Sequence, residues 1–147
     1  MVGECRDAKT ISAALEAALT GHPVYTTLHT SGVAETMRRL VTSFSGEERL
    51  GRTIDILETI RLCIWQKLAP TVDGKRVALR EYLVFDEAAR DILLEADPND
   101  VTRVTRQLVR ERGRLMTVDA KEKFDEGIIS ERTYNLIIAG SKDPADA

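Results

Sequence analysis

The alternation of apolar and polar residues predicts a helix from Asp7 to Leu19. Its apolar residues recur at intervals of three and four, which places them on one face: Ile11, Ala14, Leu15, Ala18 and Leu19. Asp7 suits the N-cap position, while Gly21 and Pro23 suit the end of a helix. The β-rich run from Val24 to Leu28 that follows predicts a short strand.

Two further helices are predicted before Pro70. The first has an apolar face formed by Val33, Met37, Leu40, Val41 and Phe44. The second starts at a capping box, Ser45 and Glu48, in which each side chain bonds a backbone N–H of the other residue. It can continue to about Lys67, and Pro70 ends it. Its expected buried face consists of Leu50, Ile54, Leu57, Ile60, Ile64 and Leu68.

A hairpin is predicted around Asp73 and Gly74. These residues lie between two strand-like runs, the second of which extends from Val77 to Phe85. Asp-Gly is typical of two-residue hairpin turns in which both residues adopt positive φ. The sequence therefore predicts one antiparallel pair of strands in this region.

The rest of the chain predicts helices only. Asp86 suits the cap of a helix that ends near Glu95, and Asp97-Pro98 suits the start of one that ends at Gly113. This second helix has three apolar residues that we expect to face inward: Val101, Val104 and Leu108. The two shorter helices that follow span about residues 118–125 and 131–138.

Composition bounds the class of protein. The 147 residues suffice for one domain with its own core, and 43% apolar with 31% charged residues is typical of a globular protein. A net charge of −3 and a pI near 5.5 do not favour nucleic acid or an anionic membrane as the main partner. We interpret a run of arginines as a solvated helix face rather than a binding site: Arg103, Arg106, Arg110, Arg112 and Arg114.

The cysteines and the hydropathy favour a cytoplasmic setting. Cys5 and Cys63 have no metal-ligand spacing and form no disulfide framework, so a reducing compartment is expected. No apolar run approaches the roughly 18 residues that a membrane-spanning helix needs. We therefore expect no transmembrane segment.

Candidate chemistry begins at Glu4, which stands between the end of an expected strand and a helix cap. Ligands of α/β sheets gather at the carboxyl ends of strands, where a carboxylate can polarise water or hold Mg²⁺ beside a phosphate. Gly-Glu turns are common, however, so the residues alone favour the alternative of an exposed loop glutamate.

The two histidines, His22 and His29, lie at opposite ends of the predicted strand. An extended run of seven residues spans about 23 Å at roughly 3.3 Å each, so the pair cannot share one metal ion. His29 falls at the carboxyl end, on the same rim as Glu4, where an imidazole can bond a phosphate oxygen and sense the γ-phosphate. The alternative for His29 is a hydrogen-bonded histidine at a strand end with no further role.

Two motifs resemble those of the type II/type IV secretion ATPase superfamily, which includes the pilus assembly and retraction motors. The segment Gly3-Glu4-Cys5-Arg6-Asp7 is similar to the Gly-Glu-x-Arg-Asp end of its Walker B segment. Thr20-Gly21-His22 and Thr27-Leu28-His29-Thr30 are similar to its histidine box, in the same order and at the same separation. The region from Thr42 to Leu68 looks most similar to ATPases of type IVB (Dot/Icm-like) secretion and of related conjugative plasmids.

The resemblance implies roles for five residues. Glu4 matches the Walker B glutamate, which activates the attacking water and contacts Mg²⁺ indirectly. His29 matches the histidine near the γ-phosphate, so Glu4 and His29 are the implied catalytic residues. Arg6, Asp7 and His22 are implied to support the nucleotide site. The implied cofactors are ATP and Mg²⁺, both only in the full-length protein.

One motif of such ATPases is absent from the 147 residues, the phosphate-binding loop Gly-x-x-x-x-Gly-Lys-Ser/Thr. Met1 and Val2 also run directly into the Walker B end, as if in mid-strand. We therefore expect a C-terminal fragment that is inactive alone. The expected fold is α/β: the C-terminal part of a RecA-like P-loop NTPase domain, residues 1–85, with Walker B end, histidine box, long helix and hairpin. A small all-helical domain, residues 86–147, follows.

The full-length protein is then expected to be a hexameric ATPase for secretion or conjugal transfer, coupling ATP hydrolysis to the translocation of substrates or pilus subunits. The implied location is cytoplasmic and peripheral at the inner membrane, with the inner-membrane secretion machinery as partner and no direct binding of nucleic acid. The alternative is a truncated, non-catalytic paralogue that acts as an interaction subunit of that machinery.

Overall fold

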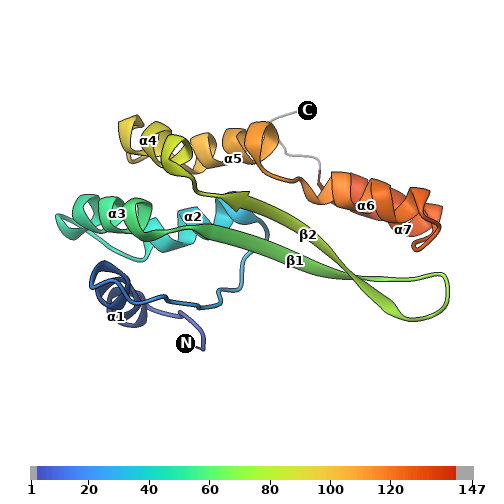
Figure 1. The fold of residues 1–147 in the computed structure, drawn as a ribbon, viewed down its shortest axis with the longest axis horizontal. Coiled ribbons are helices and arrows are strands. Elements are labelled where there is room, and N and C mark those ends of the chain that lie inside the picture. Colours follow the sequence, from blue (N-terminus) through green and yellow to red (C-terminus); the bar gives the residue numbers. More distant parts are fainter. Residues whose placement is uncertain (1–2, 142–147) are drawn as a thin grey trace.

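A hairpin of two long strands crosses the molecule, and helices gather around both of its halves (Figure 1). The computed structural model describes residues 3–141, so Met1 and Val2 of the expected mid-strand start lie outside the described residues. The described elements are α1 (Ala8–Leu19), α2 (Val33–Thr42), α3 (Glu48–Thr59), β1 (Leu62–Pro70), β2 (Arg76–Val84), α4 (Glu87–Glu95), α5 (Val101–Arg112), α6 (Met116–Asp125) and α7 (Glu131–Gly140).

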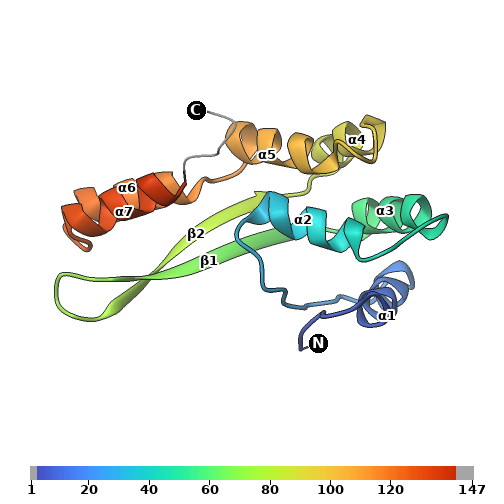
Figure 2. The ribbon, with the colours of Figure 1, turned by 180° about the vertical axis from the view of Figure 1, so that it is seen from behind.

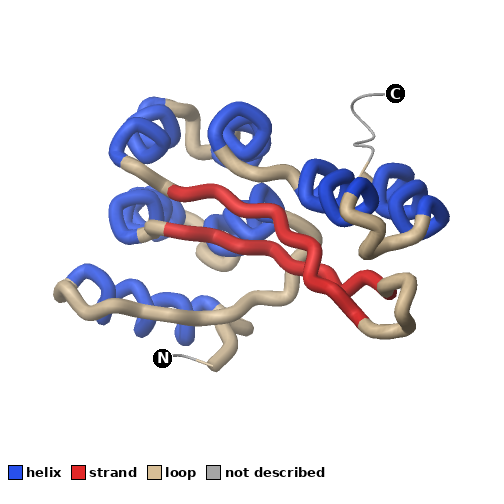
Figure 3. The backbone as a smooth tube through the Cα atoms, turned by 45° about the vertical axis from the view of Figure 1, so that its right-hand side comes forward, coloured by secondary structure: helices blue, strands red, loops and turns tan. Residues whose placement is uncertain are grey.

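The helices form two groups along the hairpin. In the larger group α2 packs against both strands and α5, while α3 contacts α1, α2 and α4; the view from behind shows α2 in front of the hairpin (Figure 2). In the smaller group α6 packs against β2 and α7 packs against α6, farther along the hairpin toward its turn (Figure 3). The hairpin therefore connects the two groups.

The hairpin is antiparallel, with Leu62 opposite Val84 and Pro70 opposite Arg76, as the prediction of one strand pair requires. Its turn differs in detail from the prediction. Only Gly74 of the predicted pair has a positive φ, +80°, because no non-glycine residue among those described adopts one. The Gly74 N–H donates to Thr71 O at 3.1 Å, and the Thr71 N–H donates to Lys75 O at 3.0 Å. Residues 72–74 therefore form a three-residue loop, which needs glycine at one position only.

The predicted long helix to Lys67 is wrong. α3 ends at Thr59, Ile60 is extended, and residues 62–70 form β1 instead. The run from Ile60 to Trp65 is rich in β-branched and aromatic residues, which favour a strand. Its backbone N–H and C=O groups pair with β2, whereas in a helix they would pair within the segment.

The predicted start and buried face of this helix also differ from the structure. Its N-cap is Glu47, with no side-chain hydrogen bond, so the capping box at Ser45 does not form. The buried side chains of α3 are Thr53, Ile56 and Leu57. Of the predicted face, Leu57 is buried, whereas Leu50, Ile54, Ile64 and Leu68 are exposed.

The predicted strand from Val24 to Leu28 is extended but forms no strand in the structure. A backbone bond from Cys5 N–H to Thr27 O, 3.0 Å, joins it to the segment before α1, and Thr27 Oγ1 donates to Gly3 O at 2.7 Å. A strand needs a continued ladder of such bonds along its length. The segment therefore keeps a strand-like course without a strand's partners.

The C-terminal helices follow the prediction except at the start of α5. Asp86 accepts from Ala89 N–H and Ser130 accepts from Thr133 N–H, as N-caps of α4 and α7. α5 starts at Val101 rather than Pro98, because Asp97 instead accepts from Asn99 N–H at 2.8 Å and closes a turn.

Two apolar clusters make up the core. The larger draws on α1 to α5 and both strands, and so extends beyond residue 85 into α4 and α5. The smaller lies under α6 and α7, and consists of Ala69, Leu79, Met116, Ala120, Ile129 and Ile137. The domain boundary at residue 85 stays a prediction.

Candidate nucleotide site

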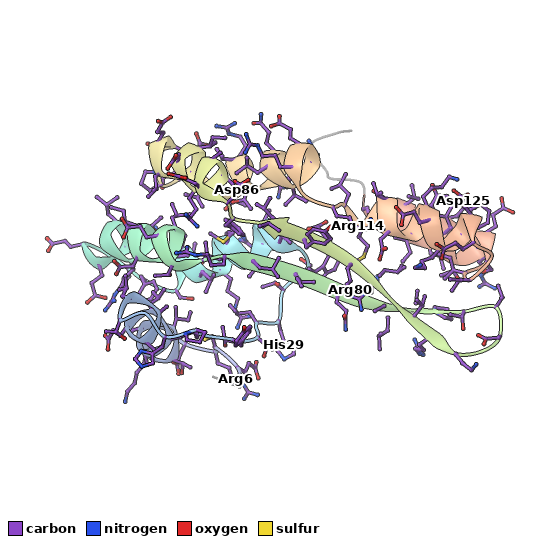
Figure 4. All side chains as sticks on the ribbon, in the orientation of Figure 1. Arg6, His29, Arg80, Asp86, Arg114 and Asp125 are labelled. Carbon is purple, nitrogen blue, oxygen red and sulfur yellow. The ribbon has the colours of Figure 1, made fainter. Side chains whose placement is uncertain are left out.

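Glu4 and His29 lie together beside the N-terminus of α1. The Glu4 carboxylate is partly buried, with its side chain 23% exposed, and pairs through Oε2 with Arg6 at 2.8 Å. Its Oε1 lies 3.4 Å from His29 Nε2. Arg6 and His29, both well exposed, lie on the same side of the molecule (Figure 4). The structure thus joins residues that are 25 positions apart.

The charge of Glu4 is favoured by its neighbours. The Arg6 guanidinium, through its hydrogen bond, holds the pKa of the Glu4 carboxyl below its usual value, against the opposing effect of desolvation. The charge of Arg39 lowers this pKa further, as does the His29 imidazole in its protonated form. A depressed folded-state pKa adds stability above the unfolded pKa, which is lost as the pH falls through the folded value. Because its pKa lies below the ordinary value of a glutamate, Glu4 is ionised at neutral pH.

The backbone around Glu4 is held on both sides. Cys5 is buried, and its Sγ lies 3.1 Å from Thr26 Oγ1, next to the backbone bond between Cys5 and Thr27. On the other side Asp7 caps α1 by accepting from Thr10 N–H at 2.8 Å, and this bond lowers the pKa of Asp7. Glu4 is thus fixed between a helix cap and the extended segment that leads to His29.

The loop that carries His29 is held by α2. Arg39 donates to His29 O at 2.6 Å, and Thr30 Oγ1 lies 2.7 Å from Thr36 Oγ1. Sequence reasoning missed Arg39, which belongs to no motif; its ten-residue separation from His29 becomes a contact only because α2 folds back beside the loop. Arg39 therefore acts on the site through the backbone of His29 and through its charge.

His22 is not part of this arrangement. Its Nδ1 lies 3.0 Å from Thr20 Oγ1, and Thr20 in turn donates to Ala17 O and Glu16 O at the end of α1. The structure therefore places His22 at the C-terminus of α1, away from Glu4. Its supporting role, like the roles of Arg6 and Asp7, stays a prediction.

Glu4 offers the chemistry that indirect Mg²⁺ contact needs, an ionised and solvent-accessible carboxylate. Within residues 3–141 no group of three or more histidine, cysteine or acidic side chains is placed to hold a metal ion. Mg²⁺ usually keeps several waters and takes one or two carboxylates plus phosphate oxygens, so one carboxylate fits this mode.

Several arginines after residue 100 pair with carboxylates of their own chain. Four such pairs are Arg103–Asp100 at 3.0 Å, Arg106–Glu35 at 3.2 Å, Arg112–Asp86 at 3.7 Å and Arg114–Asp119 at 2.8 Å. Arg103 fits the solvated helix face that we expected, whereas Arg106 and Arg112 pair with residues outside α5 and Arg114 lies beyond the end of α5. Across the described part of the chain, no helix has both the length and the apolar character to span a bilayer.

Known proteins share this fold. The Legionella pneumophila ATPase DotB matches with a TM-score of 0.93 and 85% identity, over 95% of this chain and 38% of that one. The pilus retraction motor PilT with bound ADP matches with a TM-score of 0.79 and 29% identity, over 99% of this chain and 40% of that one. These matches confirm the predicted α/β fold of a P-loop secretion ATPase.

Sequence comparison agrees with the structural one. A twitching motility protein of Neisseria gonorrhoeae is 42% identical over 106 residues, which are 71% of this chain and 27% of that protein. The chain thus spans about a quarter to two fifths of the length of these relatives. Residues 1–75 match the family model described as type II/IV secretion system protein. With both motifs, the fold and this match in agreement, the chain belongs to the type II/IV secretion system protein family.

Proposed function

We propose that this chain is the C-terminal portion of a hexameric ATPase that couples ATP hydrolysis to the translocation of substrates or pilus subunits, in secretion or conjugal transfer. The observation that carries the proposal is the pairing of Glu4 with His29, 3.4 Å apart, in a member of this family. The ATPase would work in the cytoplasm, peripheral to the inner membrane, with the inner-membrane secretion machinery as its partner.

We assign each residue of the site a separate role. Glu4, ionised and oriented by Arg6, accepts a proton from the water that attacks the γ-phosphate. His29 donates a hydrogen bond to a γ-phosphate oxygen, and Arg39 holds its backbone in place. Mg²⁺, when bound with ATP, would neutralise charge on the phosphates, and Glu4 would hold it through water.

A second candidate function is that of a non-catalytic interaction subunit of the secretion machinery. The 147 residues contain no phosphate-binding loop. In either case we expect the chain by itself to bind ATP very weakly, because such a loop supplies most of the backbone donors and the lysine. Titration calorimetry of the chain with ATP and Mg²⁺ measures this. Binding in the micromolar range would contradict the expectation.

The two histidines should differ when each is replaced in the complete ATPase. We expect His29→Ala to lower kcat while ATP binding changes little, because a γ-phosphate contact acts mainly on the transition state. We expect His22→Ala to act through stability or assembly, since His22 bonds Thr20 at the end of α1. Steady-state kinetics, melting and hexamer fraction would be measured for both. A loss of kcat in intact hexamers of His22→Ala alone would reverse the assignment.

A further inference from the structure

Glu81 is a half-buried carboxylate on β2 that the proposed mechanism does not use. Its Oε1 accepts a hydrogen bond from Val33 N–H at 2.9 Å, across 48 residues of sequence. A β-carbon at Gly32 would lie only 3.3 Å from the same oxygen, so the loop backbone closely approaches the carboxylate. β2 and the start of α2 therefore meet at this one side chain.

The first turn of α2 has no side-chain cap of its own. Its N-cap is Gly32, which has no side chain to accept from the first-turn amides. Unpaired amides and the positive end of the helix dipole favour a carboxylate at this place. Glu35, in the first turn of α2, pairs with Arg38 and Arg106, whereas Glu81 of β2 accepts from the Val33 amide, so the α2 N-terminus is held in part by a residue of another element.

α2 in turn holds the loop of His29. Thr36, in the first turn, bonds Thr30, and Arg39, one turn later, bonds the backbone of His29. A shift of the α2 N-terminus must therefore move the His29 loop, whose exposed imidazole is not held by packing. His29 would then leave its place beside Glu4.

We propose that Glu81 is a positioning residue of the ATPase site: by capping α2 from β2, it sets His29 beside Glu4. The catalytic part of this proposal rests on the function proposed above, whereas the capping part does not. Burial raises the pKa of Glu81, while the amides of Val33 and Met116 and the charge of Arg106 favour its ionised form. Burial outweighs the groups that favour ionisation, so the cap rests on the 2.9 Å hydrogen bond from Val33 N–H to Glu81 Oε1.

Asp119 provides a matched control. It is a buried carboxylate that also contacts β2: it accepts from Arg80 N–H at 2.8 Å and pairs with Arg114 at 2.8 Å. It lies in α6, so it ties β2 to the C-terminal helices and not to α2. Asp119→Asn should therefore destabilise the chain without displacing His29.

The test uses the histidine ring signals of the 147-residue chain in a proton–carbon NMR spectrum, which the two histidines keep simple. In Glu81→Ala we expect the His29 signals to shift or broaden while the His22 signals stay as in the wild type. The amide of Val33 should exchange with solvent about 2- to 30-fold faster, as expected for a lost cap. In Asp119→Asn neither change should occur.

Glu81→Gln keeps the volume of the side chain and one acceptor oxygen, so it tests the role of the charge. It also serves as the test variant should Glu81→Ala fail to fold. We expect smaller changes in the His29 signals and in the Val33 amide exchange than in Glu81→Ala. Unchanged His29 signals in Glu81→Gln and Glu81→Ala, or equal changes at both histidines, would overturn the proposal. The NMR measurement needs no ATP turnover. An inactive wild-type ATPase would therefore contradict the proposed function but leave the capping role of Glu81 unaffected.

Turnover in the complete ATPase gives the second readout. We expect Glu81→Ala to lower kcat by about 10- to 100-fold with little change in KM for ATP, the cost of a misplaced catalytic group. Asp119→Asn, compared at a temperature where both variants are folded, should keep its kcat. Equal losses of kcat in the two variants would reduce Glu81 to a structural residue.

Discussion

Glu4→Gln is expected to abolish ATP turnover in the complete ATPase while ATP binding stays nearly intact. Glutamine keeps the volume of the side chain but cannot accept the proton of the attacking water or offer a full negative charge to hydrated Mg²⁺. It also loses the ionic part of the 2.8 Å pair with Arg6. A positioned acid–base group typically contributes about 100-fold or more, so the expected loss in kcat is at least of that size.

The measurement combines steady-state phosphate release with calorimetric ATP binding. Glu16→Gln is a suitable control, because Glu16 lies in α1 and pairs only distantly with Arg52, 3.8 Å, outside the site. That variant should retain wild-type turnover. If Glu4→Gln kept more than about a tenth of the wild-type kcat, Glu4 could not be the general base.

Leu57→Ala is expected to destabilise the chain by about 2–5 kcal/mol, the usual cost of a large-to-small change at a buried site. Leu57 is 1% exposed, in the larger core cluster where α3 packs between α1, α2 and α4. The truncation leaves a cavity that neighbouring elements cannot all close, since each is held by contacts on its other sides.

Leu50→Ala, in the same helix, is the matched control for this substitution. Leu50 is 56% exposed, so its loss should change the free energy of unfolding by about 0.5 kcal/mol or less. Urea unfolding followed by circular dichroism compares the two variants. A similar loss of unfolding free energy in both variants would mean that α3 presents a different face to the core.

The sequence by itself determined those elements whose signals act over a few residues. Asp7, Asp86 and Ser130 each cap the helix that follows, and each bonds an amide three residues ahead. Such bonds need no distant segment, so α1, α4 and α7 could be predicted closely, whereas the equally local signals at Ser45 and Asp97 did not form the predicted caps. Glu4 and His29 were singled out because their motifs resemble those of the secretion ATPase superfamily, since the residues alone left both open.

Tertiary structure decided what local signals leave open. Residues 62–67 fit a helical period as well as a strand, and only pairing with β2 makes them β1. Residues 24–28 have strand composition but lack a ladder, so they remain merely extended. Periodicity reports which side of an element is apolar, whereas a strand also needs partners for its backbone groups, and those partners lie far away in sequence.

The same distinction holds for the candidate site. Its two proposed catalytic residues follow from motifs, whereas Arg39 and Glu81, which we propose to position them, make contacts to backbone atoms. Every residue type except proline has the same backbone N–H and C=O groups. The sequence therefore does not show which residue accepts or donates such a contact. Only the folding of α2 between β2 and the His29 loop brings these groups within hydrogen-bonding distance.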